Sequence, residues 1–381
     1  MRAVGVVAEY NPFHNGHRYH LQRAREISGA DVVVAVMSGN FVQRGAAAMF
    51  NKWQRTNEAL HNGADIVIEL PFHWAVQPAH LFAQGALSLL SALQVPDLVF
   101  GAEHEQTDFT ALARVGINDT QAFKTFNETY ATLFNDQLES QTGFRLDQPN
   151  DILGYGYAVA NSRLQTPLNL LPIKRVGRDY HDSLLDNSGY SSATAIRQTV
   201  LGHRRGVNVA ANVPAETFAD IRHLTPMAGW SPQMWQLLRH ELLMTPVASL
   251  HEVYQMSEGL EFRLKEAAET QAHWDDFLTA IKTKRYTYTR LQRVCLYTLV
   301  HAVNAEMVPG QPDYLRLLGF TTAGQNYLNV YKKRFTLPLI TRFDQTLKKT
   351  TLNLDYRAGM LYEMLTGQAQ DFRHDPIRLE S

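Results

Sequence analysis

Apolar strand patterns and amphipathic helix patterns alternate over the first two hundred residues of the chain. Residues 3–8 are small and β-branched apolar side chains, which is typical of a strand buried on both faces, and Pro12 ends any ladder after it. Further buried strands are predicted at residues 31–37, 64–71, 95–101 and 168–176, with helices at 53–61, 79–93 and through much of 107–163. This alternation indicates right-handed βαβ units on a parallel sheet.

The alternation stops near residue 205. The rest of the chain shows mostly helical patterns, at residues 216–223, 232–243, 250–255, 260–268, 274–281, 289–303 and 323–333, and two short strand patterns at 314–320 and 337–341. We therefore predict an α/β fold in which a Rossmann-like parallel-sheet domain spans residues 1–204. A mostly α-helical C-terminal domain would span residues 205–381, with the junction at residues 202–206.

Composition and charge narrow the class of protein. Of the 381 residues 45% are hydrophobic, and no stretch of 18 uncharged apolar residues predicts a membrane span. The single cysteine, Cys295, excludes an internal disulfide and fits a reducing cytosol, so a cytoplasmic protein is expected. The net charge is −1, but twelve Lys or Arg and three acids between residues 280 and 350 make that segment +9 and leave the rest at −10. This segregation indicates a basic face for a polyanion.

The densest basic run carries tyrosines between its cations. Such a run is typical of RNA recognition, because cations bind phosphates and exposed rings stack on unpaired bases. The alternative is a helix start whose cations are only solvated. The candidate RNA contacts are Lys282, Lys284, Arg285, Arg290 and Arg293.

Two histidines mark the start of the first predicted helix. His14 and His17 lie three residues apart on one helical face, and Gly16 between them leaves room for a base or a ribose. Unpaired N–H groups and the positive dipole end of a helix attract anions, and both imidazoles can donate to phosphate. We therefore predict that nucleotide phosphates bind here. The alternative interpretation is that one histidine caps the helix and the other is solvated.

A second polar group stands at a later helix start. Ser192 and Thr194 open this helix with Arg197 one turn in, a set that can surround a leaving anion. Gly101 ends a strand where a nucleotide can approach closely, although a plain strand-to-turn glycine is the alternative. Asn150 is either a nucleotide contact or a plain helix cap.

Three cations follow the second strand, at Arg44, Lys52 and Arg55. They either face polyphosphate or RNA, or belong to a solvated loop. The chain contains no CxxC, HExxH or GxSxG pattern, so neither a metal held by the protein nor a serine hydrolase is supported.

These motifs resemble known families. His14-x-Gly16-His17 after the first strand resembles the signature of the HIGH-type nucleotidyltransferase superfamily, and Ser192, Thr194 and Arg197 resemble its second signature. The longer string EYNPFHNGH is similar to a narrower family, the bacterial tRNA(Met) cytidine acetate ligases. That resemblance covers nearly the whole chain, through SGNFVQRG, FGAE, PNDILG, IKR, YHD, SATAIR, KRYTYTRLQR and LGF.

The resemblance implies an ATP-dependent tRNA-modifying ligase. Acetate and ATP would form acetyl-adenylate, and the acetyl group would pass to the 4-amino group of the wobble cytidine in elongator tRNA(Met), giving N4-acetylcytidine. Mg²⁺, if needed, would be carried by the nucleotide. His14, His17 and Arg197 would be catalytic, and Ser192, Thr194 and Arg197 would hold the β and γ phosphates and the leaving pyrophosphate. The implied ATP contacts are Val7, Ala8, Glu9, Tyr10, Asn11, Pro12, Phe13, His14, Asn15, Gly16, His17, Arg18, Tyr19, His20, Gly101, Asn150 and Arg175.

Two other functions fit parts of the pattern. An adenylyltransferase or a pantothenate synthetase-like enzyme would make the same kind of adenylate but use a small-molecule acceptor, which needs no +9 surface. A non-catalytic, ATP-sensing RNA-binding protein would not require His14, His17 and Arg197 together. We therefore favour the tRNA-modifying ligase.

Overall fold

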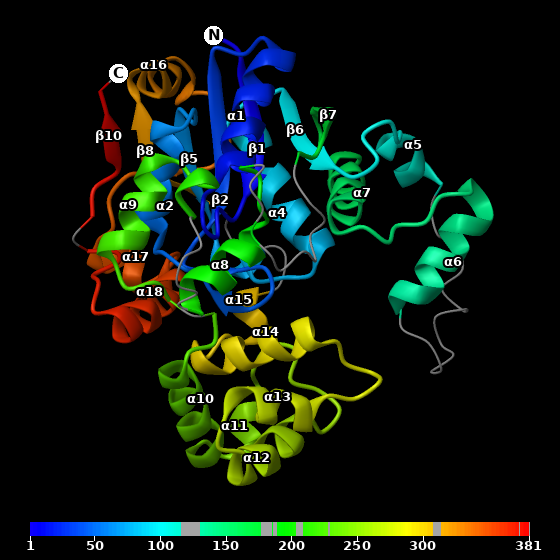
Figure 1. Ribbon diagram of the computed structural model, residues 1–381, viewed down its shortest axis with the longest axis vertical. Helices are drawn as coiled ribbons and strands as arrows, with labels where there is room; N and C mark the ends of the chain where they lie inside the picture. Colours follow the sequence, from blue (N-terminus) through cyan, green and yellow to red (C-terminus); the bar gives the residue numbers. More distant parts are fainter. Residues whose placement is uncertain are drawn as a thin grey trace.

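A central sheet carries helices on both faces, with a helical lobe beneath one edge of the sheet (Figure 1). The computed structural model describes residues 1–115, 130–176, 185, 189–202, 209–227, 229–307, 314–372 and 374–380. Apart from Gly202, the predicted junction at residues 202–206 lies outside these ranges.

The N-terminal strands pair in parallel, in the order β5-β2-β1-β6-β7. Their bounds are Ala3–Ala8 for β1, Val32–Ser38 for β2, Ile66–Leu70 for β5, Asp97–Ala102 for β6 and Asn169–Lys174 for β7. Each lies within a few residues of a predicted strand, so the predicted parallel sheet is confirmed. The strand β1 lies at its centre, with Ala3 opposite Val32 on β2.

Helices pack on the two faces of the sheet because alternate strand residues point to opposite sides. On one face α4 (Ala79–Ala92) and α7 (Pro149–Asn161) cover Val34, Ile68 and Leu98. On the other face α1 (Asn15–Ser28) and α2 (Lys52–His61) cover Val33 and Val67. The other elements of this part are β3 (Phe41–Val42), β4 (Ala46–Ala47), α3 (Phe72–Ala75), α5 (Phe109–Arg114), α6 (Tyr130–Thr142), α8 (Ala193–Leu201), the 3₁₀ turn Val209–Ala211 and α9 (Ala215–His223).

The C-terminal part of the chain returns to the same sheet. The strand β8 (Leu315–Thr321) pairs antiparallel with β5, and β9 (Leu339–Ile340) and β10 (Ile377–Leu379) pair parallel with β8. The helix between β8 and β9 is α16 (Thr322–Tyr331). The division of the chain at residue 205 stays a prediction, but the second segment is not helical alone, since it completes the sheet of the first.

Helices α10 to α14 form the lobe around an apolar core that includes Leu238, Leu264, Phe277 and Leu291 and continues into residues of β3, α3 and α18. Their bounds are Pro232–Met244, Val247–His251, Leu260–Thr270, Trp274–Ile281 and Tyr288–Leu299, and they are followed by α15 (Asn304–Met307), α17 (Gln345–Lys349) and α18 (Asn353–Thr366). The helix predicted at residues 250–255 is wrong: α11 ends at His251, and Gln255 has a left-handed φ of 61° that no helix interior accepts.

The lobe lies against the carboxyl edge of the sheet (Figure 1). The ring nitrogen of Trp230 donates to the carbonyl of Gly45 in the β3–β4 hairpin, and the Tyr297 hydroxyl donates to the carbonyl of Val76 after β5. Gly45 has a φ of 75°, and a Cβ there would lie 2.6 Å from the backbone nitrogen of Arg293. The close approach of α14 to this edge therefore requires glycine.

Candidate active site

The turn from β1 into α1 holds His14 and His17 in one compact arrangement. Nδ1 of His14 accepts the backbone N–H of Gly16 at 3.0 Å, and Nδ1 of His17 accepts the N–H of His14 at 3.2 Å. The two rings stack with centroids 3.7 Å apart. Because both Nδ1 atoms accept, each neutral ring carries its proton on Nε2. Each histidine thus caps the helix with one nitrogen and keeps a donor on the other, so capping and phosphate binding are not alternatives.

Both rings are neutral at pH 7. Burial, followed by the positive charges of Arg175 and Arg197, lowers the pKa of His14 to about 3. Burial also lowers the pKa of His17 well below its usual value, with His14, His20 and Arg175 adding to the effect. Two neutral Nε2–H donors beside two guanidiniums form a site for an anion.

The first backbone N–H groups of α1 already have partners. The N–H of Asn15 donates to the carbonyl of Asn212 at 3.0 Å, that of Gly16 to His14, and that of His17 to the carbonyl of His14 at 2.9 Å. These N–H groups are therefore paired, contrary to expectation, while phosphate binding at this turn stays a prediction. The acceptor at Asn212 lies far along the chain, where no local pattern points to it.

The second motif lies against the first. Nη1 of Arg197 donates to the carbonyl of Asn11 at 2.5 Å, and Nη2 donates to the Thr194 hydroxyl at 3.1 Å. The Ser192 hydroxyl caps α8 by accepting the N–H of Ala195 at 3.1 Å. The N–H groups of Ala193 and Thr194 have no acceptor among the described residues. The helix end that is open to a phosphate is that of α8.

The side chain of Asn15 fastens these two segments together. Its Nδ2 donates to the carbonyls of Gly189 at 2.9 Å and of Ala211 at 2.8 Å, on either side of α8. The loop before Ser192 and the loop after α8 are therefore both held at the start of α1. The two signature motifs therefore lie side by side.

A third cluster lies at the carboxyl end of β6, next to β1. Gly101 leaves open space, since a Cβ added there meets no atom within 4 Å. Asn150, at the start of α7, donates its side-chain Nδ2 to the Glu103 carboxylate at 2.6 Å, and Arg175 after β7 lies 3.5 Å from the same carboxylate. Glu103 was not among the predicted site residues, although an acid directly after a buried strand at the ligand edge was a usable signal.

The other predicted ATP positions lie in β1, in the turn that follows it and in α1, and they differ in burial and in their partners. Tyr10 and Phe13 are buried in the core beside His17, and Asn11 accepts the N–H of Met49 through its side chain at 2.8 Å. The His20 ring contacts the carbonyl of Val99 at 3.0 Å. Val7, Ala8, Glu9, Asn15, Gly16 and Tyr19 are half-buried along the same edge, Pro12 is buried and Arg18 is exposed.

Two of the three loop cations that were candidates for phosphate or RNA are internal. Arg55 has an exposed fraction of 0%, and it donates to the carbonyls of Phe50, Glu9, Ser38 and Gly39. It therefore ties the carboxyl ends of β1 and β2 together. Among the three, Arg44 is the one at the surface.

Lys52 belongs to a buried group of four charges. Its Nζ lies 3.0 Å from both Glu69 oxygens and 2.9 Å from Asp371, and Arg316 lies 2.7 Å from Asp371 and 3.3 Å from Glu69. Burial alone would raise the pKa of Asp371, but Lys52 and Arg316 outweigh it and hold that pKa below its usual value. Pairing inside the protein explains why Lys52 does not face a ligand.

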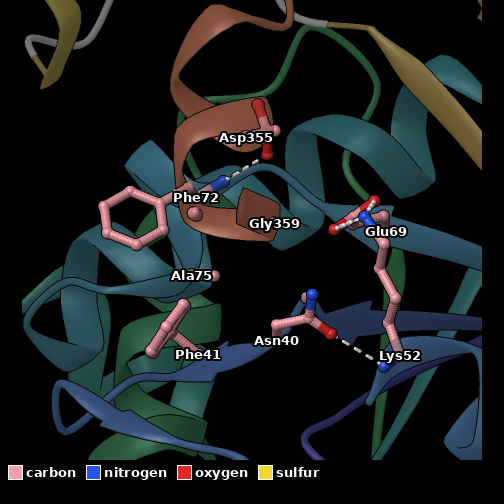
Figure 2. Close-up of a pocket in the computed structure, with 10 residues that line it drawn as sticks. Asn40, Phe41, Lys52, Glu69, Phe72, Ala75, Asp355 and Gly359 are labelled. Atoms are coloured by element: carbon pink, nitrogen blue, oxygen red, sulfur yellow. Dashed lines mark hydrogen bonds and ion pairs between the residues drawn. The ribbon is translucent and has the colours of Figure 1, made fainter. Parts of the chain in front are cut away.

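A small pocket beside this group is not an anion site (Figure 2). Asn40, Phe41, Phe72 and Asp355 line it together with Lys52. The three protons of the Lys52 ammonium are matched by three carboxylate oxygens, and the Asp355 carboxylate accepts the N–H of Phe72 at 3.0 Å. No donor at the Lys52 ammonium is left for a further carboxylate.

The predicted RNA contacts differ in accessibility. Lys284 and Arg285 are both exposed, and Arg285 pairs with Glu258 at 2.5 Å. Arg290 is half-buried and lies over the ring of Tyr286, 4.5 Å from its centroid. Lys282 lies 5.3 Å from the ring centroid of Tyr288, which is 48% exposed.

Arg293 and Tyr286 lie inside the lobe. Their exposed fractions are 8% and 5%, so neither offers a surface cation or a free ring face to RNA. The residues between 280 and 350 also do not form one face: α16, which ends next to Lys332, Lys333 and Arg334, lies at the end of the molecule remote from the lobe that contains α14 (Figure 1). Charge counted along the chain did not predict this separation.

Neither a metal-binding cluster nor a membrane-spanning helix is present among the described residues. They include no group of three or more His, Cys, Asp or Glu side chains placed to hold a metal ion. Within the same residues, no helix has the length and apolar character that crossing a bilayer requires.

Comparison with known proteins gives the family. A model of the HIGH nucleotidyl transferase family matches residues 1–375. The tRNA(Met) cytidine acetate ligases of Limosilactobacillus fermentum and Leuconostoc citreum are 51% and 49% identical, over 100% and 99% of this chain and 100% and 97% of their own. Crystal structures of Thermotoga maritima TmcAL, apo and bound with alpha-thio ATP, match with TM-scores of 0.90 and 0.87 at 30% identity and cover 100% of both chains. The resemblance seen in the motifs is confirmed: the chain belongs to the HIGH nucleotidyltransferase family and, within it, to the tRNA(Met) cytidine acetate ligases.

Proposed function

We propose that this protein uses ATP to activate acetate and then acetylates the wobble cytidine of elongator tRNA(Met), giving N4-acetylcytidine. The observation that carries the proposal is the contact between the two signature motifs, in which Arg197 donates to the carbonyl of Asn11 beside the stacked pair His14 and His17. Full-length relatives with this named activity support it, as does the related fold bound with an ATP analogue.

The proposed ATP site uses the groups that the structure places at the carboxyl edge. The Nε2–H donors of His14 and His17 would contact the phosphates, and Ser192, Thr194 and Arg197 at the start of α8 would hold the β and γ phosphates. The open space at Gly101, with Asn150 and Arg175 beyond it, would take the adenosine. Neutral imidazoles suit this role, since they donate without adding charge that would bind pyrophosphate too tightly to release.

In the first proposed step an acetate oxygen attacks the α-phosphorus of ATP. A P–O bond forms to acetate, the bond to the β-phosphate oxygen breaks, and pyrophosphate leaves with the electron pair. Arg197 and the two histidines would stabilise the charge that grows on the phosphate oxygens. Mg²⁺ would enter with the triphosphate.

In the second step the 4-amino nitrogen of cytidine attacks the acetyl carbonyl of acetyl-adenylate. The bond to the AMP oxygen breaks, AMP leaves, and the amine loses one proton to solvent or base. The tRNA would lie across the lobe. Lys284 and the ring of Tyr288, which follow α13 in the chain, are exposed there. We place the enzyme in the cytoplasm, where tRNA, ATP and a reduced Cys295 occur together.

The test is direct. The protein is incubated with labelled acetate, ATP and a tRNA(Met) transcript, and the RNA is digested and searched for labelled N4-acetylcytidine. We expect label that depends on ATP and is lost when uridine replaces the wobble cytidine. Release of pyrophosphate without labelled RNA would favour a small-molecule acceptor, and ATP binding without either product would favour a sensor.

A further inference from the structure

Glu103 connects three parts of the proposed nucleotide site through one carboxylate. It follows β6 directly, and its side chain is 15% exposed. Its Oε2 accepts the backbone N–H groups of Asn150 and Asp151, both at 3.1 Å, which closes the N-terminus of α7. Its Oε1 accepts Nδ2 of Asn150 at 2.6 Å and lies 3.5 Å from Nη1 of Arg175.

The chemistry of a carboxylate fixes the orientation of the Asn150 amide. An ionised carboxylate can only accept hydrogen bonds, so the group 2.6 Å from it must be the NH₂ and not the oxygen of Asn150. The amide oxygen then points away from Glu103. This Oδ1 has no partner among the described residues, and the Asn150 side chain is half-buried. It is an acceptor that a ligand can reach.

We infer that Glu103 is a positioning residue that makes Asn150 select a ligand with a hydrogen-bond donor on its adenosine part. The inference rests on the proposed function. The donor is either the 6-amino group of adenine or a ribose hydroxyl, since both are N–H or O–H groups that an amide oxygen accepts.

Glu103 acts through its neighbours and not on the phosphates. A carboxylate facing a triphosphate would repel it, but this one is compensated by the Arg175 guanidinium and by two N–H groups at a helix start. Arg175 also lies close enough to His14 and His17 to lower the pKa of both rings. One carboxylate therefore sets the relative positions of Asn150 and of the guanidinium beside the histidines.

Glu103→Gln tests the inference because it should reverse the amide of Asn150. The oxygen of the new amide stays with the two backbone N–H groups that Oε2 accepts, so the new NH₂ group replaces Oε1 and faces the side chain of Asn150. Two NH₂ groups cannot pair, so Asn150 turns its oxygen toward residue 103 and its NH₂ toward the ligand. Binding of ATP and of ITP, which has a 6-oxo acceptor in place of the amino group, is measured by calorimetry without tRNA. The preference for ATP over ITP is expected to fall by about tenfold, the value of one hydrogen bond between neutral groups. If the ribose is the partner, the preference for ATP over 2′-deoxy- or 3′-deoxy-ATP falls instead.

Two further variants make the test specific. Asn150→Ala keeps the two backbone bonds of Glu103 and is expected to lose the same preference, and adding Glu103→Gln to it should change that preference no further. Glu105→Gln, the same chemical change two residues along, should leave every ratio unchanged. Weaker binding of all nucleotides by Glu103→Gln with unchanged ratios would overturn the inference. Wild-type protein that binds no ATP would instead refute the proposed function.

Discussion

The two nitrogens of His17 have separate tasks, and substitutions can separate them. Nδ1 accepts the N–H of His14 and so helps to cap α1, whereas Nε2 carries the proton that is free for a phosphate. Asn places its side-chain oxygen where Nδ1 lies, and Gln places its NH₂ where Nε2–H lies. His17→Asn should therefore keep the cap and lose the donor, and His17→Gln should do the reverse.

The expected loss of stability and the expected loss of activity differ enough in size to be measured separately. Loss of one capping bond costs about 1 kcal/mol, which in a chain of this length lowers the thermal midpoint by no more than about 3 °C. Loss of one donor to a charged transition state lowers kcat by about 10² to 10³. We therefore expect His17→Asn to unfold near the wild-type midpoint but to release pyrophosphate at least about a hundredfold more slowly.

The assay is pyrophosphate release at saturating ATP and acetate, beside a thermal scan of each variant. His17→Gln should keep more activity than His17→Asn while losing more stability, and His17→Ala should lose both. If His17→Asn were as active as wild type, the phosphate role of Nε2 would be refuted. If it were as unstable as His17→Ala, the capping role of Nδ1 would be.

Three other outcomes follow from the geometry. Because the pKa of His14 falls to about 3 in the folded protein, the unfolded state binds more protons below pH 6.5. The unfolding free energy should therefore drop between pH 7 and 4. His14→Asn should flatten that pH dependence when the unfolding free energy is measured by denaturant titration. Arg55→Met should lower the unfolding free energy by about 3 kcal/mol or more in urea, since it leaves four carbonyls without their donor. Lys284→Glu should weaken tRNA binding in filter assays while sparing pyrophosphate release, and Lys333→Glu at the far end of the molecule is the control; equal effects would contradict the placement of tRNA on the lobe.

Local pattern predicted the elements at the centre of the molecule well. Residues 3–8 form a strand as expected, and the helix after Pro12 begins at Asn15. A run of β-branched residues followed by a proline and a polar stretch has few structural solutions, and short-range sterics decide among them. The candidate groups of the nucleotide site, His14 and His17 above all, could be selected for the same reason.

The sequence pattern did not show which residues far apart in the chain contact one another. The pattern predicts Lys52 as a loop cation, but Glu69 and Asp371 surround it in the structure. The carbonyl of Asn212 accepts the N–H of Asn15, and no residue near Asn15 predicts that contact. The strand at residues 314–320 was visible, but its antiparallel partner β5 was not. Pairing across hundreds of residues depends on tertiary packing, which a window of neighbours does not contain.

The pairing of β8 with β5 has a consequence for the synthesis of the protein. A ribosome delivers the chain from its N-terminus, so β5 emerges long before β8 can cover it, and Lys52 and Glu69 emerge long before Arg316 and Asp371 can complete their buried group. An early-terminated product would keep a bare strand edge and a Lys52–Glu69 pair without the two charges that complete the buried group. Such fragments are natural substrates for proteases, and the sheet that carries the proposed nucleotide site is completed only when nearly the whole chain has been made.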